Sequence, residues 1–226
     1  PNWLNTGGGD GMESAIDPTD AAYSYSTVYY GSITRRINNA SGRNVAGQGN
    51  HGIDEAGAWV TPFIIGENDP NVMVVGFKNV WLCKNVKTTG ALKWDKISNN
   101  LGGKNNVNGR VVEQSPSDFD LLFYVRGDGM IFRTNNLFDP TPAWADLTAS
   151  KPVNGSPTDI ECHHYLSNVV YMTMSNRVYK SEDTGASWED ISGSLPDIPM
   201  NSICYDKTSN EGLYIGTDAG VYYKDA

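Results

Sequence analysis

The eight residues from Ser181 to Trp188 read Ser-Glu-Asp-Thr-Gly-Ala-Ser-Trp and fit the pattern S-x-D-x-G-x-x-W. This spacing predicts a tight turn between two strands. The Asp183 carboxylate can accept hydrogen bonds from loop amides that would otherwise lack partners. Gly185 can adopt the left-handed backbone conformation, and the Trp188 ring can pack between the hairpin and its sheet. We therefore interpret Ser181, Asp183, Gly185 and Trp188 as a structural motif rather than a catalytic one.

The tryptophan of this motif recurs along the chain. Trp94, Trp144 and Trp188 each begin a segment of the form Trp-x-x-(Ile or Leu)-(Ser or Thr), with spacings of 50 and 44 residues. Two short β-branched, aromatic or alternating segments precede each tryptophan, at 72–76 and 80–84, 121–125 and 130–134, and 169–173 and 177–181. Four short strands repeated every 40 to 50 residues are typical of a propeller blade.

The repeat predicts an all-β protein, a β-propeller of four-stranded blades with four to five blades present. We treat 1–226 as a single propeller region, with blades at about 12–58, 59–104, 105–154, 155–197 and 198–226. The last blade has three expected strands, at 201–205, 213–216 and 220–223. Either the segment around Trp3 supplies the fourth strand and closes a ring, or the chain is part of a larger propeller. We favour the second alternative.

Composition excludes two classes of partner. The net charge is −9, and Arg35-Arg36 is the only arginine pair, whereas nucleic-acid binding needs clustered cations. The longest apolar runs fall short of the roughly 18 residues that a membrane-spanning helix needs. High glycine and aromatic contents, 24 residues and 11%, instead suit a β-rich protein with many tight turns.

With these motifs in view, the chain resembles Asp-box (BNR) repeat β-propellers such as sortilin, the sialidases and the xyloglucanases. A closer resemblance is to secreted bacterial proteins exported by the type IX route. It is carried by Gly-Gly-Asp-Gly-Met at 8–12, Gly-Ala-Trp-Val-Thr-Pro-Phe at 57–63 and Gly-Thr-Asp-Ala-Gly-Val-Tyr-Tyr at 216–223. The resemblance implies residence outside the cell or at its surface, and it implies that further blades of the same parent protein are partners.

Our first hypothesis is a non-catalytic extracellular module that binds a polysaccharide or a protein partner at the cell surface. Loops on a rigid scaffold carry recognition, and 38–59 is a long segment rich in Gly and Asn. His51 and Trp59 within it, together with Asp10, are the candidate ligand-binding residues, because an aromatic ring beside amide side chains suits sugar recognition. A purely structural plug is an equally good interpretation of this segment.

The alternative is a glycoside hydrolase, which needs two carboxyl groups across the scissile bond. The Gly-Asp-Gly context of Asp10 resembles that of one catalytic Asp in xyloglucanases, so Asp10 and Glu13 are candidate catalytic residues. Asp54 and Glu55 lie in a long loop that could reach the same opening of the propeller. A tight turn capped by Asp10 explains the same residues without catalysis, and we favour it. A third alternative is an assembly scaffold for a larger complex.

Metal and cofactor chemistry are not expected. No phosphate-binding Gly-Lys-Ser/Thr loop is present in the sequence, and His51, His163 and His164 do not form a metal-binding spacing. His163 and His164 should lie on one strand and face opposite sides. The odd number of cysteines leaves at least one thiol unpaired. Buried thiols at Cys83, Cys162 and Cys204 are favoured, and one disulfide stays open as an alternative.

Overall fold

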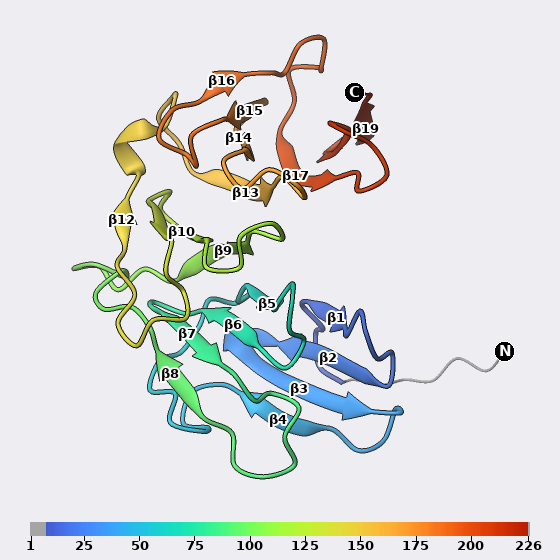
Figure 1. Cartoon of the computed structure of the whole chain (residues 1–226), viewed down its shortest axis with the longest axis vertical. Helices are drawn as coiled ribbons and strands as arrows, with labels where there is room; N and C mark the ends of the chain where they lie inside the picture. The colour runs from blue at the N-terminus through green and yellow to red at the C-terminus, as the bar shows by residue number, and fades with distance from the viewer. Residues whose placement is uncertain (1–7, 226) are drawn as a thin grey trace, which may run out of the picture. The chain divides into compact units, whose positions relative to one another are not determined.

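The computed structural model describes residues 8–225, so the closing strand predicted around Trp3 lies outside the described residues. The fold is all-β. Within these residues, nineteen strands form five antiparallel sheets, four with four strands and one with three, and neighbouring strands in each sheet follow one another in sequence (Figure 1). The fold-class prediction of an all-β chain of four-stranded units is therefore confirmed.

We name the sheets A to E in chain order. Sheet A contains β1 (Ser14–Ile16), β2 (Tyr23–Val28), β3 (Ser32–Ile37) and β4 (Arg43–Ala46). Sheet B contains β5 (Phe63–Ile65), β6 (Met73–Gly76), β7 (Val80–Cys83) and β8 (Trp94–Lys96). Sheet C contains β9 (Gly109–Gln114), β10 (Leu122–Arg126), β11 (Ile131–Thr134) and β12 (Ala145–Asp146). Sheet D contains β13 (Pro157–Cys162), β14 (Val170–Met174), β15 (Arg177–Ser181) and β16 (Glu189–Asp190). Sheet E contains β17 (Met200–Tyr205), β18 (Leu213–Thr217) and β19 (Gly220–Lys224).

The second strand of each of sheets B, C and D is apolar on both faces. Every residue of β6, β10 and β14 is buried, because such a strand meets side chains on both sides of its sheet. Burial on both faces explains why these segments read as nearly continuous β-branched and aromatic runs rather than as strict alternation. The strands found at 73–76, 122–126 and 170–174 lie within a residue of those predicted.

The chain divides into two compact units, residues 1–110 and 111–226. A core cluster of the first unit includes Tyr25 and Phe77, which are among its largest fully buried side chains. In the second unit, one cluster lies between sheets C and D around Phe123, and another lies between sheets D and E around Tyr171. That residues 1–226 form a single propeller region stays a prediction.

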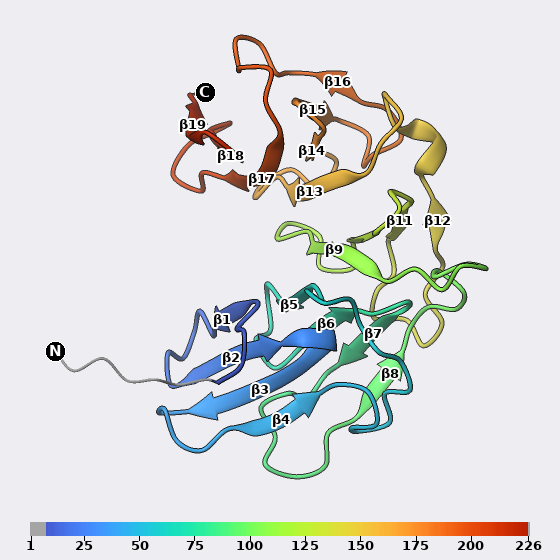
Figure 2. The same cartoon turned by 180° about the vertical axis from the view of Figure 1, so that it is seen from behind.

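Antiparallel order decides which loops share an end of a sheet. In sheet A, β2 runs opposite to β1 and β3, and β4 runs opposite to β3. The β2–β3 turn and the segment that follows β4 therefore emerge at the same end, and the β3–β4 turn emerges at the other (Figure 2). The two short 3-10 helices are η1 (Tyr29–Gly31), which forms that β2–β3 turn, and η2 (Thr148–Ser150).

Two local predictions were wrong. Residues 38–59 do not form one long insert, because 43–46 are β4, which pairs with β3. The remaining connector runs from 47 to 62. His163 and His164 do not lie within a strand, because β13 ends at Cys162. Both histidines belong to the following turn, where His163 is buried. Among the described residues, no helix is long and apolar enough to cross a membrane.

Candidate functional site

The β2–β3 turn of sheet A has an unusual backbone. Tyr30 adopts φ 62° and ψ 26°, a left-handed conformation that is rare for a bulky side chain and costs of order 1 kcal/mol or more. Gly31 follows with φ 77°, and a Cβ atom there would lie 2.5 Å from the Phe77 ring. Only glycine fits at this position. The turn therefore presents two consecutive tyrosines in a conformation that the surrounding structure must impose.

The connector between sheets A and B imposes it. The Tyr30 amide donates a hydrogen bond to the Ala58 carbonyl at 3.1 Å, and the Gly57 amide donates to the Tyr30 carbonyl at 3.3 Å. The Thr61 hydroxyl also donates to the Ala58 carbonyl at 2.8 Å. These bonds hold the residue that follows Ala58, Trp59, beside the tyrosine turn.

Three rings meet there, and we call Tyr29, Tyr30 and Trp59 the aromatic platform. The Tyr29 and Trp59 rings stack, with centroids 5.3 Å apart and planes 21° apart. Tyr30 meets both edge-on, with centroids 5.5 Å from Tyr29 and 5.6 Å from Trp59. The exposed fractions of these residues are 43%, 51% and 51%. Burial of an apolar ring is the default in a folded protein, so a mutually packed group left half in solvent marks a candidate binding surface.

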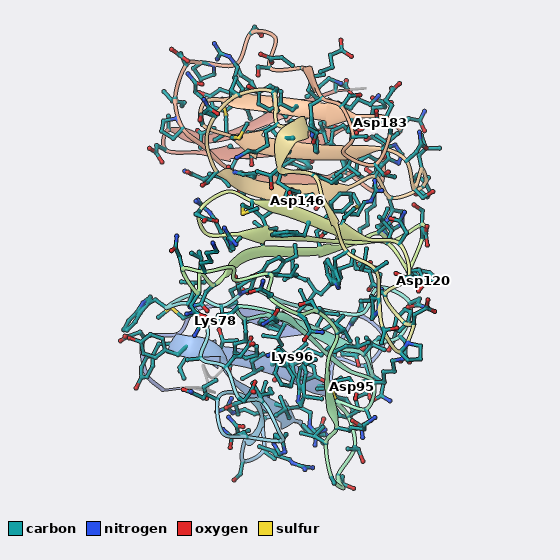
Figure 3. All side chains as sticks on the ribbon, turned by 90° about the vertical axis from the view of Figure 1, so that its left-hand side faces the viewer. Lys78, Asp95, Lys96, Asp120, Asp146 and Asp183 are labelled. Carbon is teal, nitrogen blue, oxygen red and sulfur yellow. The ribbon has the colours of Figure 1, made fainter. Side chains whose placement is uncertain are left out.

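A buried carboxylate anchors the connector just before the platform. Glu55 is 8% exposed. It accepts hydrogen bonds from the Asn79 amide at 2.9 Å, the Asn79 side chain at 2.6 Å and the Trp81 indole at 3.3 Å. The ammonium of Lys96, a residue labelled in Figure 3, lies 2.6 Å from Glu55 Oε1. Burial raises the pKa of Glu55, but the contacts with Lys96, Asn79 and Trp81 outweigh it, so the net shift is downward. The carboxylate is ionised and fully engaged.

Asp10, the first catalytic and ligand-binding candidate, lies in an exposed loop before β1. Gly9 and Gly11 flank it with φ 79° and 60°. The Met12 amide donates to the Thr27 carbonyl at 3.1 Å, so this loop leaves sheet A at the same end as the tyrosine turn. Glu13 is half-buried, and its amide donates to the Thr27 hydroxyl at 2.9 Å.

The other connector candidates are oriented toward the scaffold. His51 places its Nε2 atom 3.1 Å from the Asn44 carbonyl of β4, and its φ of 53° belongs to a tight turn. The Asp54 carboxylate is exposed and lies 3.8 Å from the Lys96 ammonium. Of the predicted ligand-binding residues, only Trp59 is found in an aromatic cluster.

The Ser181–Trp188 turn lies between β15 and β16 of sheet D. Asp183 accepts hydrogen bonds from the Ser187 amide at 2.8 Å and the Ser187 hydroxyl at 2.6 Å (Figure 3). The Ser181 hydroxyl accepts a hydrogen bond from the Gly185 amide at 2.8 Å, and Gly185 has φ 86°. The Trp188 indole donates to the Ser150 hydroxyl at 3.3 Å. The contacts of Ser181 and Asp183 organise the turn itself, and Trp188 joins it to the segment that follows β12.

Sequence reasoning missed Tyr29 and Tyr30. The Tyr-Tyr-Gly sequence at the end of a strand was a usable signal, since two large rings before a glycine suggest a displayed turn. Their pairing with Trp59 depends on hydrogen bonds between residues almost 30 positions apart, which no local pattern specifies.

Metal binding finds no support in the part of the chain that the structure describes. Between residues 8 and 225, no group of three or more His, Cys, Asp or Glu side chains is placed to hold a metal ion. All three cysteines are free thiols. Cys83 and Cys162 are buried, but Cys204 is exposed, so the prediction of a buried thiol is wrong there.

Four-stranded antiparallel sheets repeated in sequence order are typical of the β-propeller class, and solved structures similar to the chain are β-propellers. An ancestral GH74 enzyme superposes with a TM-score of 0.66 at 15% identity, covering 99% of this chain and 32% of the enzyme. The GH74 xyloglucanase from Xanthomonas campestris gives a TM-score of 0.61 at 14% identity, over 93% of this chain and 34% of the enzyme.

YCF48 from Cyanidioschyzon merolae gives a TM-score of 0.66 at 12% identity, over 96% of this chain and 69% of that protein. The chain thus spans about a third of the length of both GH74 enzymes. No family model and no curated protein sequence matches it. At these identities the likeness establishes the β-propeller fold alone.

Proposed function

We propose that the chain is a non-catalytic module that binds a polysaccharide through the aromatic platform. The observation that carries this proposal is the platform itself: three half-exposed rings within 5.6 Å of one another. The turn that displays two of them is backbone-strained at Tyr30. Strain that the scaffold maintains is concentrated at functional sites.

Sugar rings suit this surface for a physical reason. A pyranose has an apolar face of C–H groups, and an aromatic ring that covers it removes apolar area from water without leaving a polar group unsatisfied. Tyrosine and tryptophan add a hydroxyl and an indole N–H that can bond to sugar hydroxyls. Partial burial of each platform ring beneath a sugar should contribute about 1–2 kcal/mol to the free energy of binding.

The carboxylates favour binding over hydrolysis. Hydrolysis needs two carboxyl groups placed across one bond. Glu55 is committed to Lys96 and Asn79, and Asp54 is paired with the same lysine. Asp10 and Glu13 remain the candidates of the hydrolase alternative, which the xyloglucanase activity named for a structural neighbour makes worth testing.

The finer family assignment is part of the proposal. We infer that the S-x-D-x-G-x-x-W turn marks an Asp-box (BNR) repeat, and that the protein is exported by the type IX route and resides outside the cell or at its surface. The hydrogen bonds of Ser181 and Asp183 support the first inference. Detection of the native protein by antibody in the surface and culture fractions tests the second, and retention in the cytoplasm would contradict it.

Affinity electrophoresis and calorimetry with xyloglucan and with mixed-linkage β-glucan test the binding proposal. Trp59→Ala and Tyr29→Ala should each weaken binding about 5- to 30-fold, the equivalent of about 1–2 kcal/mol. Tyr165→Ala is the matched control, because Tyr165 is 61% exposed but lies in the second unit. Equal losses in all three variants, or no binding by the parent protein, would defeat the proposal.

Two further outcomes would select the alternatives. Release of reducing sugar that Asp10→Asn abolishes would make the protein a glycoside hydrolase. A stoichiometric protein partner that survives purification, with no polysaccharide bound, would make it an assembly scaffold. Unchanged turnover in Asp10→Asn would remove the catalytic role of Asp10.

A further inference from the structure

Two asparagine–glycine pairs occur in the sequence, Asn108-Gly109 and Asn154-Gly155. In such a pair the glycine amide nitrogen can attack the Cγ atom of the asparagine side chain and close a succinimide ring. Glycine favours this reaction because it has no Cβ atom to block the approach and because its backbone adopts conformations that other residues avoid. The two pairs have the same intrinsic chemistry, so their surroundings decide whether each can react.

The Asn108-Gly109 pair is fixed by the sheet structure. Gly109 is buried and is the first residue of β9. Its amide donates a hydrogen bond to the Phe77 carbonyl at 2.8 Å, and the Oδ1 atom of Asn108 is buried as well. Ring closure at this pair requires the Gly109 amide to leave its carbonyl partner, so it must wait for local opening of the sheet.

The Asn154-Gly155 pair is open. It lies between η2 and β13, and both of its residues are exposed. Within residues 8–225, neither the Gly155 amide nor the Asn154 side chain has a hydrogen-bond partner. Gly155 has φ 151°, a backbone conformation that is rare for any residue with a side chain. The Gly155 nitrogen can therefore reach Cγ of Asn154 without breaking a hydrogen bond of the folded chain.

We propose that Asn154 is a site of spontaneous deamidation whose main product is isoaspartate. The Gly155 nitrogen forms a bond to Cγ of Asn154, the bond from Cγ to Nδ2 breaks, and Nδ2 takes up the amide proton and leaves as ammonia. Water then opens the succinimide ring. Attack at Cγ gives aspartate, whereas attack at the main-chain carbonyl gives isoaspartate, in which the chain continues through Cγ. Either product adds one negative charge to the chain.

Isoaspartate also changes the turn, because it inserts one methylene group into the main chain between residues 154 and 155. The Lys151 ammonium donates hydrogen bonds to the Gly129 carbonyl at 2.9 Å and to the Gly155 carbonyl at 2.6 Å. It thereby joins this turn to the β10–β11 turn. The two turns are closely packed, since a Cβ atom on Gly129 would lie 2.6 Å from the Gly155 carbonyl oxygen. A longer main chain displaces that carbonyl and releases the contact between the two turns.

Incubation of the full chain at about pH 8.5, followed by peptide mapping with fragmentation that locates isoaspartate, tests the site. In the folded protein Asn154 should convert at least about tenfold faster than Asn108, which corresponds to about 1.4 kcal/mol in activation free energy. In urea the two rates should agree within about threefold, because unfolding frees both glycine amides. Equal rates in the folded protein, or no conversion at Asn154, would overturn the assignment.

Isoelectric focusing with two matched variants provides an independent measurement. Asn154→Gln should lose the acidic form that accumulates in the parent protein, because the longer glutamine side chain closes its ring much more slowly. Asn108→Gln makes the same change in the fixed pair and should keep the acidic form. An acidic form that appears at the parent rate in Asn154→Gln would assign the reaction to another residue.

Hydrogen exchange separates the effect of the longer main chain from that of the charge. The isoaspartate form, isolated by ion exchange, should show faster exchange of the Gly129 amide, which donates to the Arg126 carbonyl at 2.8 Å. Asn154→Asp supplies the charge without the methylene group and should leave that exchange unchanged. Unchanged exchange in the isoaspartate form, or an equal rise in both proteins, would contradict the release of the contact between the two turns. This modification site lies in the second unit and is independent of the proposed polysaccharide binding.

Discussion

The Glu55 carboxylate accepts four contacts from Asn79, Trp81 and Lys96 two residues before Gly57, whose amide holds the strained Tyr30. Glu55→Gln removes the charge and leaves Lys96 with the exposed Asp54 carboxylate at 3.8 Å and the Trp81 ring. We expect a loss of about 2–3 kcal/mol in the free energy of unfolding, measured by urea denaturation at pH 7, because a half-broken buried pair is costly. Asp54→Asn, at an exposed side chain, should change it by less than about 0.5 kcal/mol.

The lowered pKa of Glu55 also predicts that the protein loses stability at acid pH. Since the folded pKa of Glu55 is lowered, its contribution is complete above the unfolded pKa and is lost as the pH falls through the folded pKa. Below that range the parent and Glu55→Gln proteins should converge in stability. A constant difference between them down to acid pH would show that the carboxylate charge is not what stabilises the connector.

His163 predicts a second pH dependence, nearer neutrality. Its Nδ1 atom accepts hydrogen bonds from the backbone amides of Tyr165 at 3.0 Å and Leu166 at 3.1 Å. The proton of the neutral ring must therefore be on Nε2, which lies 3.2 Å from the Asn210 carbonyl. Burial lowers the pKa of His163. Its contribution is therefore complete above the unfolded pKa of about 6.5 and is lost as the pH falls below it.

We expect the free energy of unfolding to decline between pH 7 and pH 5, and His163→Phe to flatten that decline while lowering stability at pH 7.5. His164→Gln is the control, because the adjacent ring has no part in the two amide contacts, and it should keep the parent slope. A slope that survives His163→Phe would assign the pH dependence to another group.

At the scale of the element, the Ser181–Trp188 turn is held by side-chain acceptors. Asp183→Ala removes the partners of the Ser187 amide, the Ser187 hydroxyl and the Ser181 hydroxyl. We expect a loss of about 1–2 kcal/mol in unfolding free energy and faster hydrogen exchange of the amides in the turn. Glu182→Ala removes an exposed carboxylate from Lys180, which keeps its ion pair with Glu211, and should cost less than about 0.5 kcal/mol. Equal losses in both variants would contradict the structural role of Asp183.

Strand positions were predictable because they depend on local pattern. The runs at β6, β10 and β14 are bounded by turn residues, and the fourth strands β8, β12 and β16 begin at, or directly after, a tryptophan. Contacts between neighbouring sheets were not predictable. Arg35 of β3 donates to the carbonyls of Val86 and Thr88, and Arg133 of β11 donates to that of Thr184. Each arginine reaches the turn before the fourth strand of the next sheet, about 50 residues away, and sequence periodicity does not encode such a contact.

The candidate site was predictable only in part for the same reason. Trp59 was found because an aromatic residue in a Gly-rich segment stands out. Tyr29 and Tyr30 were missed because they follow a regular strand, and their display depends on the Gly31 approach to Phe77 and on the Gly57 amide. Asp10 resembled a family motif, but the structure gives it exposed glycine neighbours rather than a second carboxylate contact.

At the scale of the whole molecule, the chain divides into two compact units. The aromatic platform belongs to the first unit, where it is built from sheet A and the connector to sheet B. Repeat proteins are stabilised by interactions within each repeat and between neighbouring repeats, so a defect in one sheet should destabilise mainly that sheet and its neighbours. The platform can therefore be tested while the second unit serves as an internal control.

Locality itself can be measured by hydrogen exchange. Val75→Ala removes buried methyl groups from the core of sheets A and B, and Met172→Ala does the same between sheets C and D. Each should cost about 2–4 kcal/mol and raise exchange mainly in the strands of its own unit. The double variant should show the sum of the two losses within about 0.5 kcal/mol, because sites without shared partners are additive. If either variant raises exchange equally in β6 and β14, the two units unfold together as one cooperative structure.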